Sequence, residues 1–311
     1  MQNEMILKYI ITDNNHNNIN QILKEKFNIS NRLLVKLINS KMIFLNGENT
    51  DTRTKVNKGD VITVNLDLIE DNSNIVPTPM PLNILYEDNW LLVLDKTAGI
   101  AIHPSLLHYN DSLSNGVKYY FDNINLRKKI RPINRLDYNT SGIVLFAKSE
   151  YIQEMLIKQM QNNQFKKEYL CIINGILKEK SGILDFPIAR KNDSIIERCV
   201  SSDGKPSRTK YSVIKKFNTC KISLVKCILE TGRTHQIRVH FSHIGYPLIG
   251  DTLYGTSSNL ISRQALHSCK VSFIHPITKK ELTIISPLAE DMQKALNSNT
   301  WLYKSFYILK I

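Results

Sequence analysis

The chain contains little of what marks a secreted, disulfide-bonded or membrane-spanning protein. Its five cysteines are scattered along 311 residues and form no Cys-x-x-Cys pair, which disfavours a disulfide framework and a structural zinc site. The longest apolar runs, such as residues 90–94, are much shorter than a bilayer-spanning helix. The first residues lack the basic and apolar regions of a secretory signal. We therefore expect a cytoplasmic protein with reduced thiols and no membrane contact.

Several signatures of cofactor and hydrolase sites are also absent. The sequence contains no GxGxxG, GxxxxGK[ST], GxSxG or HExxH pattern, which disfavours a dinucleotide site, a P-loop, a serine-hydrolase elbow and a zinc protease. His235, His240 and His243 invite a zinc interpretation, but no cysteine pair or carboxylate lies at a ligand spacing from them. We expect no metal, no nucleotide and no other cofactor.

Acidic residues are few relative to basic ones. The chain has 28 Asp and Glu against 41 Lys and Arg, a formal net charge of +13. An excess of this size indicates a polyanionic partner, which is nucleic acid, a membrane surface or an acidic substrate. The hydrophobic content of 42% is sufficient for a packed core. The charge alone does not choose among the three partners.

The first 66 residues have the pattern of a small α/β domain. Apolar residues recur at helical spacing, and Ser30 is a plausible N-cap for the second helix. The expected elements are helices over residues 19–27 and 31–38, strands over 42–45 and 61–64, and a hairpin turn at Asn46-Gly47. Residues 67–83 are acidic and rich in proline, which is typical of a linker. We therefore expect domains at 1–66 and 84–311 with a linker between them.

The larger domain mixes strands and helices without strict alternation. This order disfavours a doubly wound parallel sheet and favours an α+β domain with a mixed sheet. Its expected elements are strands over residues 91–94, 142–147, 169–173 and 220–229, and helices over 152–160 and 237–244.

A carboxylate beside a cation precedes one of these strands. Arg135-Leu136-Asp137 is followed by Thr140-Ser141-Gly142 and an apolar run. In an extended segment the side chains of Arg135 and Asp137 point the same way. An aspartate held ionised by a cation could serve as a nucleophile or a base. On spacing alone, a weak surface ion pair in a turn is the commoner explanation.

A second polar cluster surrounds the start of the last expected helix. Arg233, Gln236 and Arg238 lie in the segment TGRTHQIRVH, residues 231–240. Such side chains at a helix start could hold phosphates or reach a carboxylate, although a solvated helix face has the same pattern. Tyr169, entering a strand, offers a flat face for a base and a hydroxyl for proton transfer, but a strand tyrosine is more often part of the core.

Taken in order, these segments resemble the RluA-type family of RNA pseudouridine synthases. Any one motif is weak, but the ordered set is highly specific and covers about residues 80 to 290. The matching segments are YEDNWLLVLDK at 86–96 with Gly99 and His103-Pro104, RLD at 135–137 with TSG at 140–142, KEYL at 167–170, TGRTHQIRVHF at 231–241, and the residues Gly245, Pro247-Leu248, Gly250-Asp251, Tyr254-Gly255, RQALH at 263–267 and His275-Pro276. Residues 18–66 are similar to the S4 RNA-binding module.

The resemblance implies a fold, a substrate and roles for individual residues. It implies a mixed, largely antiparallel sheet, and a monomer that isomerises uridines of RNA, most plainly large-subunit (23S-type) ribosomal RNA. Asp137 takes the part of the nucleophile, either forming a covalent adduct or abstracting a ribose proton. Arg238 pairs with it, Tyr169 stacks on the target base, and Arg135 fills the space of the extruded nucleotide. The further RNA-binding residues implied are Arg233, His235, Gln236, Arg32, Lys36 and Lys41.

The chain also departs from the family pattern at three positions that flank the substrate. Asn134 stands where histidine is usual, Tyr138 where lysine or arginine often follows the aspartate, and Thr97 where proline is usual. Two other functions remain open. One is a non-catalytic RNA-binding or ribosome-assembly factor on the same fold. The other is a carboxylate-based hydrolase, for which Asp251 or Asp185 would supply the second carboxylate.

Overall fold

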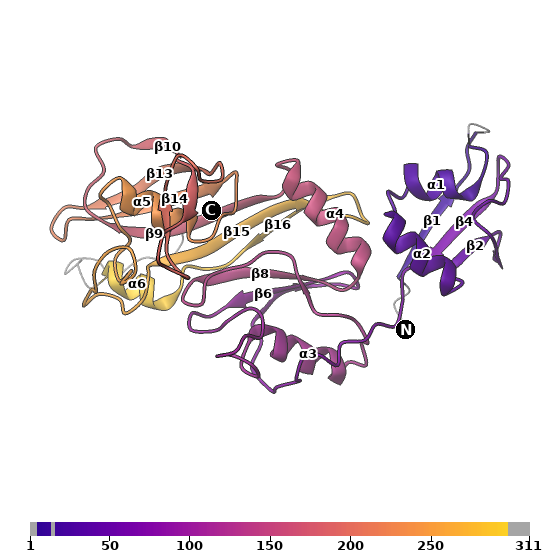
Figure 1. The fold of residues 1–311 in the computed structure, drawn as a ribbon, viewed down its shortest axis with the longest axis horizontal. Coiled ribbons are helices and arrows are strands. Elements are labelled where there is room, and N and C mark those ends of the chain that lie inside the picture. Colours follow the sequence, from indigo (N-terminus) through magenta and orange to yellow (C-terminus); the bar gives the residue numbers. More distant parts are fainter. Residues whose placement is uncertain (1–4, 14–15, 298–311) are drawn as a thin grey trace.

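The computed structural model describes residues 5–13 and 16–297, which form two main sheets (Figure 1). Within these residues, no helix has the length and apolar character needed to cross a bilayer. The smaller sheet is antiparallel, has the order β1-β4-β2-β3 and carries two helices. Its elements are β1 (Ile6–Ile10), α1 (Ile19–Glu25), α2 (Asn31–Asn39), β2 (Ile43–Leu45), β3 (Glu48–Asn49) and β4 (Val61–Asn65).

Local signals account for most of this N-terminal unit. The Asn18 and Ser30 side chains cap α1 and α2 by accepting from the backbone N–H groups of Gln21 and Leu33. Asn46 and Gly47 both have positive φ, as a two-residue hairpin turn requires. The sequence analysis missed β1, because this strand buries few of its residues and shows no clear alternation.

The larger sheet has ten strands and the order β10-β13-β14-β9-β15-β8-β6-β5, with β16 beside β15 and β7 beside β8. Among the described residues, β8 and β15 of this sheet run parallel, and the other neighbouring strands of the sheet are antiparallel. The expected α+β class with a mixed, largely antiparallel sheet is confirmed. Its strands are β5 (Ile84–Glu87), β6 (Leu91–Lys96), β7 (Arg131–Pro132), β8 (Ser141–Ala147), β9 (Lys166–Asn174), β10 (Ser181–Asp185), β13 (Arg208–Phe217), β14 (Ile222–Leu229), β15 (Leu266–Ile274) and β16 (Glu281–Ile285).

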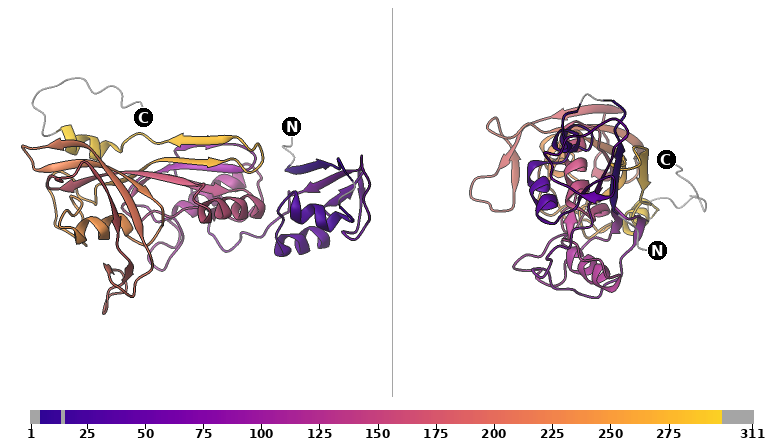
Figure 2. Two further views of the ribbon diagram at one scale, coloured as in Figure 1. Left: turned by 90° about the horizontal axis from the view of Figure 1, so that it is seen from above. Right: turned by 90° about the vertical axis from the view of Figure 1, so that its right-hand side faces the viewer.

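Helices cover both faces of this sheet because its central strands alternate between two cores. In β6, Leu91 and Val93 belong to the core that includes α4, whereas Leu92 and Leu94 belong to the core that includes α3. Residues of β9 divide in the same way between α5 and α6. These helices are α3 (Leu113–Asn123), α4 (Glu150–Gln161), α5 (Gln236–His243) and α6 (Glu290–Asn297). A separate hairpin, β11 (Ile188–Arg190) with β12 (Arg198–Val200), extends away from the sheet (Figure 2).

The N-terminal unit lies beside α4 (Figure 1). The Tyr151 hydroxyl donates to the backbone oxygen of Phe27 over 2.9 Å, and the Ser30 hydroxyl donates to Glu154 over 2.8 Å. The segment 67–83 that follows the unit is itself anchored, because Glu70 accepts hydrogen bonds from the guanidinium of Arg131.

Candidate active site

A cavity of about 270 Å³ opens where the segment before β8 faces the start of α5. Most of its walls come from three parts of the chain that are far apart in sequence, residues 133–140, the start of β9 and residues 229–237, and Met160 and Leu266 complete them. Residues that line it and that the sequence analysis singled out are Asn134, Arg135, Asp137, Tyr169, Arg233, His235 and Gln236. The large sheet therefore brings the separate motifs to one place.

The segment that carries Asp137 is held by its neighbours. Asp137 begins a turn in which the Thr140 N–H donates to its backbone oxygen over 3.0 Å. Asn134 is buried, and its amide donates to Ile143 O over 2.8 Å and accepts from Leu145 N over 2.9 Å. Asn134 thus ties the segment to β8.

A glycine and a buried lysine support the same turn from behind. Gly142 has a φ of +108°, and a Cβ there would lie 2.2 Å from the backbone oxygen of Ser268, so only glycine fits. The Lys96 ammonium is buried and donates to the backbone oxygens of Thr97, Ile100 and Tyr138, each over 2.9 Å. Burial, with the charge of Arg263, lowers the pKa of Lys96 to about 7, and the charge of Asp137 opposes this.

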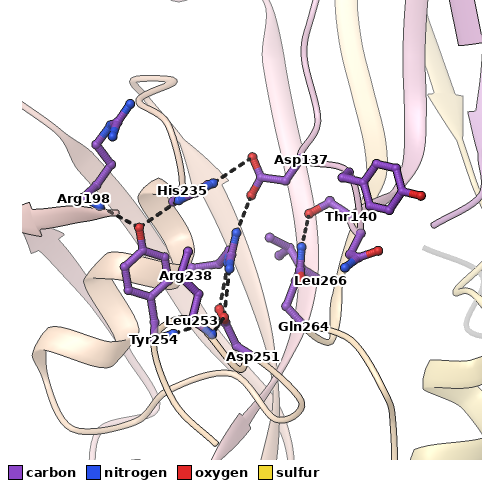
Figure 3. A network of polar contacts seen from close by, with 12 residues as sticks. Asp137, Thr140, Arg198, His235, Arg238, Asp251, Leu253, Tyr254, Gln264 and Leu266 are labelled. Atoms are coloured by element: carbon purple, nitrogen blue, oxygen red, sulfur yellow. Dashed lines mark hydrogen bonds and ion pairs between the residues drawn. The ribbon is translucent and has the colours of Figure 1, made fainter. Parts of the chain in front are cut away.

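Arg238 connects two carboxylates (Figure 3). One guanidinium nitrogen donates to Asp137 Oδ2 over 3.1 Å, while two others donate to the oxygens of Asp251 over 2.7 and 2.8 Å. Burial opposes the charge of Arg238, but its interactions with Asp251 and Asp137 outweigh this and raise its pKa above the usual value. The Asp137 side chain is 26% exposed and therefore faces both the cation and the solvent-filled cavity.

His235 lies on the other side of Asp137, with Nε2 at 3.8 Å from Oδ1 of the carboxylate. It precedes α5 in the left-handed conformation, with φ +59°, and its Nδ1 is 2.8 Å from the Tyr254 hydroxyl (Figure 3). Burial lowers the pKa of His235 more than the charge of Asp137 raises it. The imidazole is therefore neutral at neutral pH.

Two residues of β9 face the cavity. Tyr169 is only 6% exposed, and burial raises the pKa of its hydroxyl well above the usual value, so the phenol remains protonated. Lys167 lines the same cavity, and burial lowers the pKa of its ammonium. The sequence analysis quoted Lys167 within a motif but gave it no role; its alternation with Tyr169 along a strand was the available signal.

Not every residue expected to bind RNA has free polar groups. Arg135 and Arg233 are exposed at the cavity, and Arg233 also donates to Pro206 O over 3.1 Å. Gln236 is 2% exposed, and its amide makes four hydrogen bonds, to Thr231, Arg233 N, Arg208 O and Thr209. Its RNA contact stays a prediction, and the four bonds show that Gln236 also holds the loop before α5.

The basic residues of the N-terminal unit are placed differently from one another. Arg32 and Lys36 both form ion pairs with Glu150 of α4, the first over 3.1 Å. Lys41 lies beyond the end of α2, is exposed and has a φ of +54°. The three therefore do not form one uncommitted basic patch, because α4 supplies a carboxylate to two of them.

The sequence analysis missed the role of Asp251, which is to hold Arg238. It is 1% exposed, and besides Arg238 it accepts from the backbone N–H groups of Leu253 and Tyr254. A carboxylate so fully occupied is not available for the acid–base work of a hydrolase. Asp185 is exposed and lies near Arg208, at 3.6 Å. The signal for Asp251 was its place in the ordered motif set.

Among the residues that the structure describes, no group of three or more His, Cys, Asp or Glu side chains is placed to hold a metal ion.

Comparison with known proteins agrees with this arrangement. The family model described as RNA pseudouridylate synthase matches residues 90–243. An uncharacterized RNA pseudouridine synthase of Bacillus subtilis, YjbO, is 38% identical over 86% of this chain and 94% of its own. The ribosomal large subunit pseudouridine synthase D of Xanthomonas campestris is 31% identical over 89% of this chain and 87% of its own. Human RNA pseudouridylate synthase domain containing 4 shares the fold, with a TM-score of 0.57 and 21% identity over 69% of this chain and 92% of its own.

The class of protein is thereby defined as an RNA-modifying isomerase. The chain belongs to the RNA pseudouridine synthase family, in its RluA-type branch. The expected enzyme activity, RNA pseudouridine synthesis, is confirmed at the level of the family.

Proposed function

We propose that the chain converts specific uridines of large-subunit ribosomal RNA to pseudouridine, with Asp137 as the essential group. Relatives named as ribosomal large subunit pseudouridine synthase D support the choice of RNA. One observation carries the assignment of Asp137: it is the partly exposed carboxylate of the cavity, and a buried arginine holds it. A functional carboxylate needs both access to substrate and a fixed orientation.

The reaction detaches uracil from C1′ of the ribose, rotates the base and rejoins it through C5. Reactant and product are isomers, so no electrons and no donated group are required. Asp137 acts in one of two ways, by attacking to form a covalent adduct or by removing a ribose proton. In both, Arg238 orients the carboxylate and favours its negative charge.

The neighbouring residues handle the base. The target nucleotide leaves the RNA stack to reach the cavity, at a cost of a few kcal/mol. Tyr169 stacks on the uracil. Because its hydroxyl is protonated, it moves the C5 proton only as a relay, giving up its own proton as it accepts the other. Arg135, exposed at the rim, fills the space that the nucleotide leaves.

The remaining parts of the proposal concern organisation. Residues 1–66 form an S4-like RNA-binding domain, 67–83 a linker and 84–311 the catalytic domain. The separate β1–β4 sheet and the exposed Lys41 support the first of these. The enzyme acts as a monomer in the cytoplasm, since one chain supplies every wall of the cavity and its cysteines are free.

The test is modification of defined transcripts by the purified protein. Fragments of large-subunit ribosomal RNA and a set of transfer RNAs are incubated with it, and pseudouridines are mapped by chemical probing and reverse transcription. We expect pseudouridine at discrete positions of the ribosomal fragments. Modification of transfer RNA alone would contradict the choice of substrate. Binding without any modification would favour the non-catalytic RNA-binding factor.

A further inference from the structure

Tyr138, the residue directly after Asp137, projects from the catalytic turn. The hydrogen bond from Thr140 N to Asp137 O closes this turn and places Tyr138 at its corner. Its backbone oxygen accepts from the Lys96 ammonium and from Gly99 N, the latter over 3.0 Å, so its main chain is fixed. The side chain nevertheless remains 43% exposed. An exposed aromatic side chain is therefore carried on a fixed backbone one residue from Asp137, just outside the lining of the cavity.

A second ring supports it from the other side. The His108 imidazole stacks on Tyr138, with ring centroids 4.8 Å apart and an interplanar angle of 26°. His108 is in turn held by Asp111, whose Oδ2 lies 3.1 Å from Nδ1. The two rings come from loops 30 residues apart in sequence and form one small aromatic platform, which we call the His108–Tyr138 platform.

The loop that supplies His108 also exposes apolar side chains. Ser105 and His108 pair through both backbone hydrogen bonds, each 3.1 Å long, and this leaves Leu106 and Leu107 at the tip of a two-residue turn. Their relative exposures are 102% and 89%. Adjacent apolar side chains fully in water are unfavourable unless a partner covers them. The stacking of His108 on Tyr138 places this loop against the turn that carries Asp137.

We propose that the His108–Tyr138 platform, with the leucine tip beside it, is a stacking site for an unpaired nucleobase that flanks the target uridine. The ligand chemistry follows from the side chains: two stacked rings, of which Tyr138 is 43% exposed, and two exposed leucines match the flat, apolar face of a base. Phosphate would be held by cations, whereas the exposed groups here are an aromatic ring and two leucines. The site therefore binds a neighbouring base by stacking. A cation at the same place would instead bind the phosphate backbone of the RNA.

This inference rests on the proposed function, since it requires an RNA substrate in the cavity. Stacking of a base on an aromatic side chain changes affinity by about 5- to 100-fold on alanine substitution. Such stacking releases no counterions, whereas each lysine–phosphate contact adds about 0.7 to the salt slope for single-stranded RNA. The two kinds of contact can thus be separated by experiment.

The first experiment measures kcat, KM and the salt dependence of RNA binding on the ribosomal fragment that wild type modifies. Tyr138→Phe keeps the ring and should behave as wild type. Tyr138→Ala should raise KM about tenfold with an unchanged salt slope, and Tyr138→Lys should regain affinity only with a steeper slope. Tyr119→Ala, at a tyrosine of α3 that is 36% exposed, is the matched control and should change nothing.

The second experiment locates the base. Each nucleotide flanking the modified uridine is replaced in turn by an abasic residue. We expect one abasic substrate to raise KM for wild type about tenfold and to have almost no further effect on Tyr138→Ala. Additive effects at every position would overturn the stacking site.

Two other outcomes have distinct meanings. If the wild type self-associates, and Leu106→Ser with Leu107→Ser abolishes this and leaves KM unchanged, the loop binds a second copy of the chain and the inference is wrong. If wild type forms no pseudouridine in any RNA, the proposed function itself fails. Normal wild-type activity with a normal Tyr138→Ala variant rejects the stacking site alone.

Discussion

The two walls of the cavity differ in how they use their polar groups. On the α5 side, Arg238 and Asp251 are 6% and 1% exposed and satisfy one another, and the Gln236 amide is fully hydrogen-bonded within the protein. On the side of residues 133–140, the Asp137 side chain is 26% exposed and Arg135 is exposed at the cavity. We call the α5 side the closed wall, because its polar groups bond to one another. We call the side of residues 133–140 the open wall, because its side chains are accessible to a ligand.

This difference separates two requirements of the reaction. A charge that must stay in place is best supplied from a buried, hydrogen-bonded network. Groups that touch a large and mobile substrate must be accessible. Substitutions in the closed wall should therefore lower stability and turnover together, whereas substitutions in the open wall should lower turnover or RNA affinity and leave stability unchanged.

The largest effect is expected at the centre of the open wall. Asp137→Asn keeps the shape of the side chain but removes the charge, so turnover should fall at least about 10³-fold. RNA affinity should stay within a few-fold of wild type, because cations, not carboxylates, supply the phosphate contacts that dominate affinity. Turnover and filter-binding measurements on the same RNA check this. Affinity that falls in parallel with activity would contradict the assigned role.

The next largest effect is expected in the closed wall, at Arg238. Arg238→Met leaves Asp251 buried without its cation, which should lower the free energy of unfolding by about 3–5 kcal/mol and reduce kcat as well. Urea unfolding measures the first effect. The control is Arg238→Met combined with Asp251→Asn, which should recover much of the stability but not the activity. Wild-type stability in the single variant would show that the two walls do not differ as described.

Arg135→Ala tests the open wall away from the carboxylate. We expect turnover to fall roughly tenfold or more, because an extruded base is no longer replaced in the stack. The urea midpoint should not move, since Arg135 is exposed. Arg135→Lys serves as a charge-preserving control. A loss of stability without a loss of turnover would reverse the expectation.

The smallest effect concerns the N-terminal unit. Removing residues 1–66 should weaken RNA binding and lower its salt slope by about 0.7 for each phosphate that the shortened protein no longer binds. The Lys41→Gln variant of the full chain should reproduce part of this change, because Lys41 is exposed and its loss leaves the ion pairs of Glu150 intact. Titrations at several salt concentrations measure both. An unchanged slope would refute an RNA-binding role for this unit.

Local features of the molecule were predictable from its sequence. The Ser30 cap, the Asn46-Gly47 turn and the helix after Gln236 depend on residues a few positions apart. The proximity of Asp137 and Arg238, which are 101 residues apart, came only from the resemblance to a family. Spacing and composition alone left a surface ion pair as the commoner explanation.

Contacts between distant segments were beyond prediction. Gln236 has no free polar group because residues 208–209 and 231–233 converge on its amide. Arg32 and Lys36 meet Glu150 because α2 packs beside α4, and no periodicity in either helix encodes that meeting. A residue type and a motif indicate a possible role, whereas the partners of a side chain depend on the packing of the whole chain.

The most direct test of the account is pseudouridine mapping of total RNA from three strains: one lacking the gene, one complemented with the wild-type gene and one complemented with Asp137→Ala. The account predicts that specific uridines of large-subunit ribosomal RNA lose the modification in the first strain and that only the wild-type gene restores it. Restoration by Asp137→Ala would contradict the central claim that this carboxylate makes pseudouridine.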